Sequence, residues 1–193
     1  MAHTANLLSK HLREGAAVYQ TLAEGDVDEL ARATEVVIDC LRRGNKVLLF
    51  GNGGSASQAQ HITAELIGRY LKNRPGLSAI ALTTDTSNLT AIGNDFGFDL
   101  VFARQVEALA RPGDVVIALS TSGASPNVLR GIEAARRQGA TTIGFTGGVG
   151  GPLKDQTDIA ISVPSRHTPH IQEAHLAMLH ALCGAVEAAL FAD

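Results

Sequence analysis

The chain has 193 residues, of which 45% are hydrophobic and 18% charged, as is typical of one globular domain with a sizeable core. Its net charge of −3 comes from 16 basic and 19 acidic residues spread along the sequence, and only 4% of the residues are aromatic. We therefore expect no nucleic-acid partner, because such a partner requires a basic stripe or aromatic stacking residues. No apolar run approaches the roughly 20 residues of a membrane-spanning helix, so we expect no membrane partner either.

The N-terminal residues and the two cysteines bear on the compartment. Residues 1–6 lack the basic and apolar regions of a secretory signal, which predicts a cytoplasmic protein. Cys40 and Cys183 fall on expected helices and lack the paired spacing of a zinc or redox motif. We expect both to be buried thiols, since a free cysteine packs as a small hydrophobic residue.

The apolar pattern predicts the order of helices and strands. Two helices are expected first, over residues 2–20 and 26–43, the second ending at Gly44. Five short and nearly all-apolar runs then predict strands at residues 46–50, 78–82, 114–119, 141–145 and 158–163. Helical periodicity in most of the intervals predicts an α/β three-layer sandwich, in which helices cover both faces of a five-stranded parallel sheet. A long helix over residues 168–190 closes the chain, with Pro169 in its first turn.

The closing helix is apolar over much of its circumference between Leu176 and Phe191. A helix of this kind is usually buried on more than one side. We therefore expect it to contact another subunit, which makes the protein an oligomer.

A glycine-rich loop follows the first expected strand. Its sequence is Gly51-Asn52-Gly53-Gly54-Ser55, and a helical pattern carrying His61 and Glu65 comes next. Glycine lets backbone N–H groups converge on an anion, and the start of the next helix adds a partial positive charge. His61 and Glu65 are four residues apart, so they lie one turn apart on the same side of that helix. The segment predicts a site that holds a charged substrate and moves its protons.

A second polar loop follows the third expected strand. Its sequence is Ser120-Thr121-Ser122-Gly123-Ala124-Ser125, and Pro126 then fits the first position of a helix over residues 127–138. Ser125 is the expected N-cap residue. A capped turn rich in serine is the alternative interpretation. The glycine loop favours a phosphate site, because two loops at the carboxyl edge of one parallel sheet face one ligand.

A third polar segment, Gly93-Asn94-Asp95, lies in the helical region after the second expected strand. Asn and Asp tolerate the backbone conformations of turns. We interpret the segment as a turn that interrupts the helix.

Gln172 and His180 share one side of the closing helix, about 12 Å apart along its axis. With His61 and Glu65 they form a plausible set of nitrogen and oxygen ligands for Zn²⁺ or a similar metal. A metal could polarise a carbonyl while Glu65 moves a proton, or the same residues could do acid–base chemistry without a metal. For four other histidines, the sequence predicts no convergent group of functional side chains around them. We interpret them as surface or capping residues: His3, His11, His167 and His170.

These motifs together resemble those of the phosphoheptose isomerases of the sugar isomerase (SIS) fold. The resemblance rests on the glycine loop with Gln60-His61 and Glu65, on Gly93-Asn94-Asp95, on the serine loop, and on Ile171-Gln172-Glu173 with His180. It implies one SIS domain over residues 1–193, with helices used in oligomerisation in 1–45 and a sugar-phosphate-binding core in 46–193. It also implies isomerisation of D-sedoheptulose 7-phosphate to D-glycero-D-manno-heptose 7-phosphate, toward ADP-heptose and lipopolysaccharide, by a cytoplasmic homotetramer with one Zn²⁺ per subunit.

The resemblance also implies roles for individual residues. Glu65 looks like the base that takes a proton from the carbon next to the carbonyl, and His180 like its partner acid or base, through an enediol. The implied zinc ligands are His61, Glu65, Gln172 and His180. The implied substrate contacts, with the serine loop on the phosphate, are Asn52, Gly53, Gly54, Ser55, Glu65, Asn94, Asp95, Ser120, Thr121, Ser122, Ser125 and Gln172. Gln58 departs from the pattern, since many members carry Asp there, and a neutral Gln58 cannot orient His61 as a carboxylate would.

Two other functions stay open on the sequence. A related SIS protein binds the replication initiator without catalysis, and it lacks the acidic and imidazole pair that Glu65 and His180 supply here. An isomerase of another sugar phosphate is the second alternative, because the loops recognise phosphate and polyol groups that many sugars share.

Overall fold

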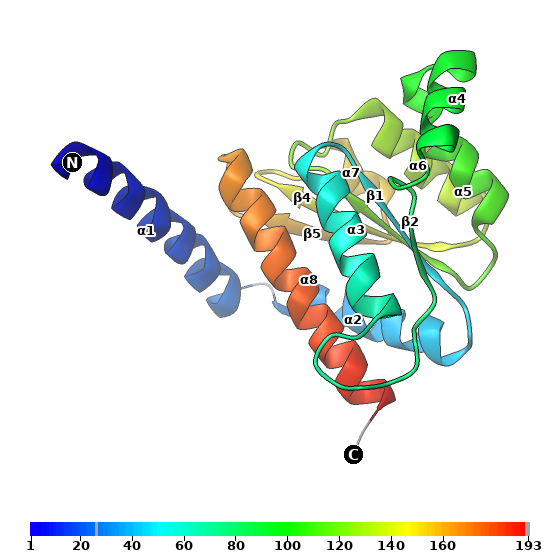
Figure 1. Ribbon diagram of the computed structural model, residues 1–193, viewed down its shortest axis with the longest axis horizontal. Helices are drawn as coiled ribbons and strands as arrows, with labels where there is room; N and C mark the ends of the chain where they lie inside the picture. The colour runs from blue at the N-terminus through cyan, green and yellow to red at the C-terminus, as the bar shows by residue number, and fades with distance from the viewer. Residues whose placement is uncertain (26, 192–193) are drawn as a thin grey trace.

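The computed structural model describes residues 1–25 and 27–191, in which a parallel sheet lies between two layers of helices (Figure 1). The strands are β1 (Val47–Gly51), β2 (Ala79–Ala81), β3 (Val115–Leu119), β4 (Thr141–Gly147) and β5 (Ile159–Val163). Their order is β2-β1-β3-β4-β5, and all neighbours pair in parallel. The five-stranded parallel sheet predicted from the sequence is confirmed.

The strand order reverses direction between β1 and β3. The chain moves outward from β1 to β2 and then returns to place β3 on the other side of β1, with Gly51 paired to Leu119. Loops that follow strands on either side of such a reversal lie at the same edge of the sheet, where α/β proteins bind ligands. The glycine loop and the serine loop are therefore neighbours, as expected.

The helices between and around the strands agree closely with the predicted pattern. They are α1 (Ala2–Glu24), α2 (Val27–Arg42), α3 (Gly54–Ile67), α4 (Thr86–Phe96), η1 (Phe98–Leu100), α5 (Ala103–Leu109), α6 (Pro126–Arg137), α7 (Gly151–Gln156) and α8 (Thr168–Leu190). The observed bounds of α8 are the predicted ones. Asp26, where the second helix was expected to begin, lies outside the described residues, as do the last two residues of the chain.

Two apolar cores flank the sheet, because side chains alternate between its faces. Val47 and Leu49 of β1 join α2, α3 and α8 in one core, while Leu48 and Phe50 join α5, α6 and α7 in the other. Every residue of β1 and β3 is buried. The central strands thus form a rigid base for the loops at their carboxyl ends.

Helix α1 extends away from this body (Figure 1). Gly15 is its one buried residue, and its exposed apolar side chains include Leu7, Leu8 and Leu12. No described helix is long and apolar enough to cross a membrane.

The predicted turn at Gly93-Asn94-Asp95 is wrong, because these residues lie inside the continuous helix α4. The helix begins at an effective cap, where the Asp85 side chain accepts a hydrogen bond from the Asn88 N–H, and it ends only at Gly97, with φ +88°. Gly, Asn and Asp cost at most about 1 kcal/mol each inside a helix, which the surrounding structure offsets.

Both cysteines are free and buried, as predicted. Burial raises the pKa of Cys40 to about 11 and that of Cys183 to about 12. Neither thiol is a reactive group at neutral pH.

Candidate active site

Helices α3 and α8 carry the acid–base residues, and they lie side by side and run in the same direction (Figure 1). Near the start of both helices, the Gln58 side chain donates a hydrogen bond of 2.6 Å to the Gln172 carbonyl oxygen. Further along, the Nε2 atoms of His61 and His180 are 2.9 Å apart. Residues 119 positions apart in the sequence thus meet because two long helices are parallel.

His61, Glu65 and His180 form one group on these helices. His61 Nε2 lies 3.4 Å from Glu65 Oε1, which confirms that the two side chains share one side of α3. The His180 ring also stacks on Tyr70, with centroids 5.8 Å apart and planes at 24°. The His61 side chain is 47% exposed and that of Glu65 22%, so the group faces solvent from a partly sheltered position. A carboxylate and two imidazoles in this arrangement can take up, hold and return protons.

The same three residues fit a divalent metal ion. One ligand atom from each of them lies within 4.8 Å of the other two. Ligand atoms of a tetrahedral zinc site lie about 3.4 Å apart, so only small side-chain movements separate this geometry from a metal site. Two imidazoles and a carboxylate are also donors that Zn²⁺ prefers.

Gln172, the fourth predicted ligand, lies near the start of α8, and its side chain points to the beginning of α3. Its amide packs so closely on Gly54 that a Cβ there would lie 2.6 Å from Gln172 Nε2. Glycine at this position therefore lets the amide reach the glycine loop. Gln58, beside it, keeps its Oε1 buried with no hydrogen-bond partner among the described residues.

The glycine loop is held against the start of α6 by a pair of amides. Asn52 Nδ2 donates to Asn127 Oδ1 at 2.8 Å, and Asn127 Nδ2 donates to Asn52 Oδ1 at 2.9 Å. Asn127 is buried, and the sequence analysis missed it. The only local signal is a polar residue directly after Pro126, in the first turn of a helix that follows a candidate anion loop.

The serine loop presents hydroxyl groups at the N-terminus of α6. Ser125 occupies the predicted N-cap position, but its hydroxyl makes no capping bond and instead lies 3.3 Å from the Ser120 hydroxyl. Gly123 has φ +64°, and a Cβ there would collide with the Gly150 carbonyl. The positive N-terminal end of α6 and these hydroxyls can bind an anion such as phosphate.

A hollow of about 320 Å³ opens beside this loop. Thr121 and Ser122 line it together with Arg166, an exposed cation that the sequence analysis did not single out. Hydroxyl groups and a guanidinium at one hollow are suited to a phosphorylated ligand.

Comparison with known proteins identifies the chain. The SIS domain family matches residues 10–147. A phosphoheptose isomerase of Rhodospirillum rubrum is 58% identical over 161 residues, covering 83% of this chain and 86% of the relative, and one of Trichlorobacter lovleyi is 49% identical over 186 residues, covering 96% and 95%. The chain belongs to the phosphoheptose isomerase family of SIS domains. The structure of phosphoheptose isomerase GmhA from Neisseria gonorrhoeae matches with a TM-score of 0.91 and 40% identity, covering 96% of this chain and 99% of that one.

In this phosphoheptose isomerase family member, Asn94 and Asp95 lie apart from the other predicted site residues. Both are exposed on α4, where Asn94 Nδ2 donates to Asp95 Oδ1 at 2.8 Å. Figure 1 shows α4 standing away from α3 and α8. The single chain therefore joins the two loops at one sheet edge and the acid–base group on the helices, but it does not bring Asn94 and Asp95 to them.

A buried ion pair that the sequence analysis missed fixes the end of α3. Glu187 of α8 accepts hydrogen bonds from the backbone N–H groups of residues 70, 71 and 72 and from Arg74 Nε at 3.0 Å. Arg74 in turn donates to the carbonyl oxygens of Glu65 and Leu66. Burial alone would raise the pKa of Glu187, but the N–H donors and the guanidinium lower it to about 2. The pair holds the turn of α3 that carries Glu65.

Three of the remaining histidines contradict the prediction that they lack a convergent context. His11 of α1 and His167 and His170 at the start of α8 gather in one cluster, and His170 is buried. Sequence separation hid this cluster, because helix α1 must fold back on α8 to form it. His175 of α8 is also buried, and its Nε2 lies 3.0 Å from the Thr146 carbonyl oxygen. Burial lowers the pKa of His175 to about 4.

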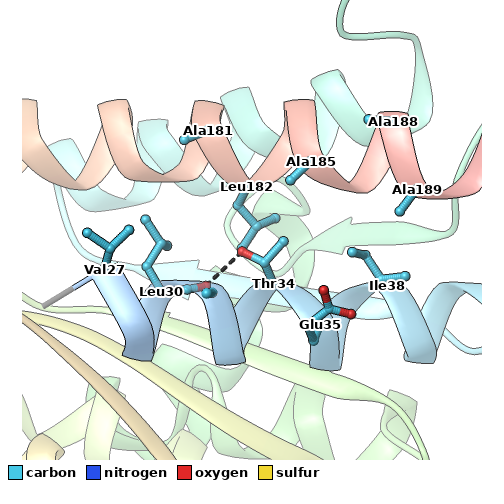
Figure 2. Close-up of a pocket in the computed structure, with 11 residues that line it drawn as sticks. Val27, Leu30, Thr34, Glu35, Ile38, Ala181, Leu182, Ala185, Ala188 and Ala189 are labelled. Atoms are coloured by element: carbon cyan, nitrogen blue, oxygen red, sulfur yellow. Dashed lines mark hydrogen bonds between the residues drawn. The ribbon is translucent and has the colours of Figure 1, made fainter. Parts of the chain in front are cut away.

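A larger hollow of about 570 Å³ runs between α2 and α8, and Figure 2 shows its lining. Leu30 and Ile38 of α2 lie opposite the small side chains of Ala181 and Ala185 of α8, and Leu182 points from α8 toward α2. The Thr34 hydroxyl donates to the Leu30 carbonyl oxygen of its own helix. An apolar groove of this kind suits a packed helix better than a sugar phosphate.

Proposed function

We propose that this protein interconverts D-sedoheptulose 7-phosphate and D-glycero-D-manno-heptose 7-phosphate. The observation that carries the proposal is the group of His61, Glu65 and His180 on α3 and α8. The N-terminal end of α3 lies in the glycine loop, and that of α8 lies beside the serine loop. The rise of α3 places His61 about 10 Å beyond Gly54. A substrate that reaches both must be long, with its phosphate at one end and its carbonyl at the other, as in a seven-carbon sugar phosphate.

The chemistry follows from the acid–base group. Glu65 takes a proton from the carbon next to the carbonyl, which gives an enediol, and after exchange with solvent it gives a proton to the neighbouring carbon. His180 moves a proton between the two enediol oxygens. The Ser120 and Ser125 hydroxyls and the N-terminus of α6 hold the phosphate, as the loop geometry supports.

We propose Zn²⁺ as the metal, held by His61, Glu65 and His180, with the Gln172 amide as the fourth ligand. The donor types and the 4.8 Å grouping of the first three support this. When bound, the ion would polarise the substrate carbonyl. Gln172 would turn from Gly54 toward the group to complete it.

We propose that the protein is a homotetramer whose subunits share the substrate sites. The apolar groove between α2 and α8 and the exposed leucines of α1 support subunit contacts through residues 1–45. In a shared site, the exposed Asn94 and Asp95 would contact the substrate that is bound in the site of a neighbouring subunit. The proposal includes a cytoplasmic location, which the two free thiols favour, and a product that enters ADP-heptose and lipopolysaccharide synthesis.

The kinetics of a Glu65→Gln variant test the chemistry. Loss of the base should lower kcat with sedoheptulose 7-phosphate by at least about 100-fold. Glu133→Gln, on the exposed face of α6, is the matched control and should keep the parent kcat. A change confined to KM would make Glu65 a binding residue only. An unchanged kcat and KM would contradict the assignment of Glu65 as the base, and a parent chain with no turnover would favour a binding protein.

A further inference from the structure

A second cluster of metal-ligating side chains lies between α1 and the start of α8, outside the proposed active site. The ring centroids of His11 and His170 are 4.4 Å apart, those of His167 and His170 4.6 Å, and those of His11 and His167 6.0 Å. One ring nitrogen from each lies within 4.8 Å of the other two. The helical rise from His170 to His180 puts this cluster about 15 Å along α8 from the proposed active site.

Glu173 fixes the orientation of the buried ring. Its Oε2 lies 3.0 Å from His170 Nδ1, and its Oε1 lies 3.0 Å from His11 Nε2. His170 Nε2 is then buried with no hydrogen-bond partner among the described residues, and the nearest carboxylate oxygen, from Glu14, is 3.8 Å away. Histidines that bind metals usually have the same arrangement: one ring nitrogen is hydrogen-bonded to a carboxylate, and the other nitrogen is free to bind the ion.

The backbone is adapted to bring the two helices together here. Gly15, the one buried residue of α1, faces the cluster, and a Cβ at this position would lie 3.4 Å from both Glu173 Oε2 and His170 Nδ1. Helix α1 therefore lies close to α8 where the imidazoles gather. A ligand bound there would join an extended helix to the body of the protein.

We propose that His11, His167 and His170 bind one divalent transition-metal ion of the zinc type, with His170 using its free Nε2 and Glu173 orienting the ring. The ion cross-links α1 to α8. Imidazole suits Zn²⁺, Ni²⁺ and Co²⁺, and three such ligands leave a fourth position for water or the nearby Glu14 carboxylate. Ion pairs with Glu173 alone do not explain the cluster, because neither His167 nor the buried Nε2 of His170 takes part in them.

The test measures the binding of Co²⁺, with no other metal present, to a variant that lacks the proposed catalytic metal site. A His61→Ala/His180→Ala variant should bind one Co²⁺ per chain in equilibrium dialysis and show the visible absorption of a tetrahedral cobalt complex. Adding His11→Ala and His167→Ala should abolish that absorption and weaken binding at least about 10-fold, on the scale of lost ligand support. Both substitutions are at side chains that are not buried, so the fold should persist, which circular dichroism checks.

Two further variants serve as controls for Co²⁺ binding. His3→Ala, on the exposed start of α1, removes an imidazole outside both clusters and should leave Co²⁺ binding unchanged. In the otherwise unaltered chain, His11→Ala/His167→Ala should lower the bound Co²⁺ by one equivalent and remove the part of the Co²⁺-induced rise in Tm that this site supplies. The proposal is overturned if the His61→Ala/His180→Ala variant binds no Co²⁺, or binds it equally well without His11 and His167. Neither outcome depends on isomerase activity.

Discussion

Replacing Glu187 by Gln tests how firmly the end of α3 is held. The Glu187 side chain is 3% exposed and that of Arg74 is 2% exposed, so the ion pair is removed from water. The glutamine amide keeps the size of the side chain but loses the charge. Its NH₂ group would also face the backbone N–H groups of residues 70–72 and the Arg74 guanidinium, which are themselves donors. Breaking a buried pair by removing one partner costs about 3–5 kcal/mol, and we expect Glu187→Gln to lower the free energy of unfolding by that amount.

Urea denaturation at pH 7 measures this loss. Glu133→Gln, which breaks exposed pairs with Arg130 and Arg137, is the control and should cost at most about 1 kcal/mol. Because Arg74 also bonds the Glu65 carbonyl oxygen, the Glu187→Gln variant should lower kcat as well. A loss of stability below about 1 kcal/mol for Glu187→Gln would refute the reasoning.

The acid stability of the parent chain tests the same contacts. Glu187 has a pKa of about 2 in the folded chain against an ordinary value of 4.5, so the unfolded chain binds the proton more readily. The stabilisation from Glu187 is therefore complete above pH 4.5 and is lost as the pH falls toward 2. The Glu187→Gln variant should lack this component, and its stability should fall less steeply over that range. Equal slopes for the two chains would contradict the assignment.

Two substitutions probe the loops. Asn127→Ala leaves the Asn52 amide without its partner, so it should lower the free energy of unfolding in urea by about 1–3 kcal/mol and raise KM. The control Asn6→Ala, on α1, should change neither quantity. An unchanged KM in Asn127→Ala would mean that the amide pair does not position the glycine loop. Gln172→Ala removes the amide that packs on Gly54 of the glycine loop, and it should weaken Zn²⁺ binding in a dialysis assay because this amide is the proposed fourth ligand. Zn²⁺ affinity equal to the parent's would remove Gln172 from the ligand set.

Much of the fold could be predicted because its determinants are local. Short apolar runs between helical segments indicate a parallel sheet, and Pro169 in the first turn of α8 indicates where that helix begins. The carboxyl ends of β1 and β3 share an edge by topology alone, so the adjacency of the two loops could also be predicted. Local signals failed at Asn94 and Asp95, where packing keeps a helix that the residue types alone do not favour.

Several other contacts between distant segments could not be predicted. The amide pair of Asn52 and Asn127 joins residues 75 positions apart, and Arg74 meets Glu187 across 113 positions. The cluster of His11 with His167 and His170 depends on how α1 lies against α8, which no pattern in either helix specifies. Such contacts are set by the packing angles of whole helices, and the sequence states only which residue types are available.

The most direct test of the proposed function is an NMR experiment in D₂O with sedoheptulose 7-phosphate and protein of known metal content. An enediol route predicts formation of the heptose aldose with solvent deuterium at C2, and the Glu65→Gln variant should form neither aldose nor deuterated sugar at a comparable rate. Aldose formed without deuterium would contradict the enediol route, and no conversion with or without added Zn²⁺ would contradict the proposed activity.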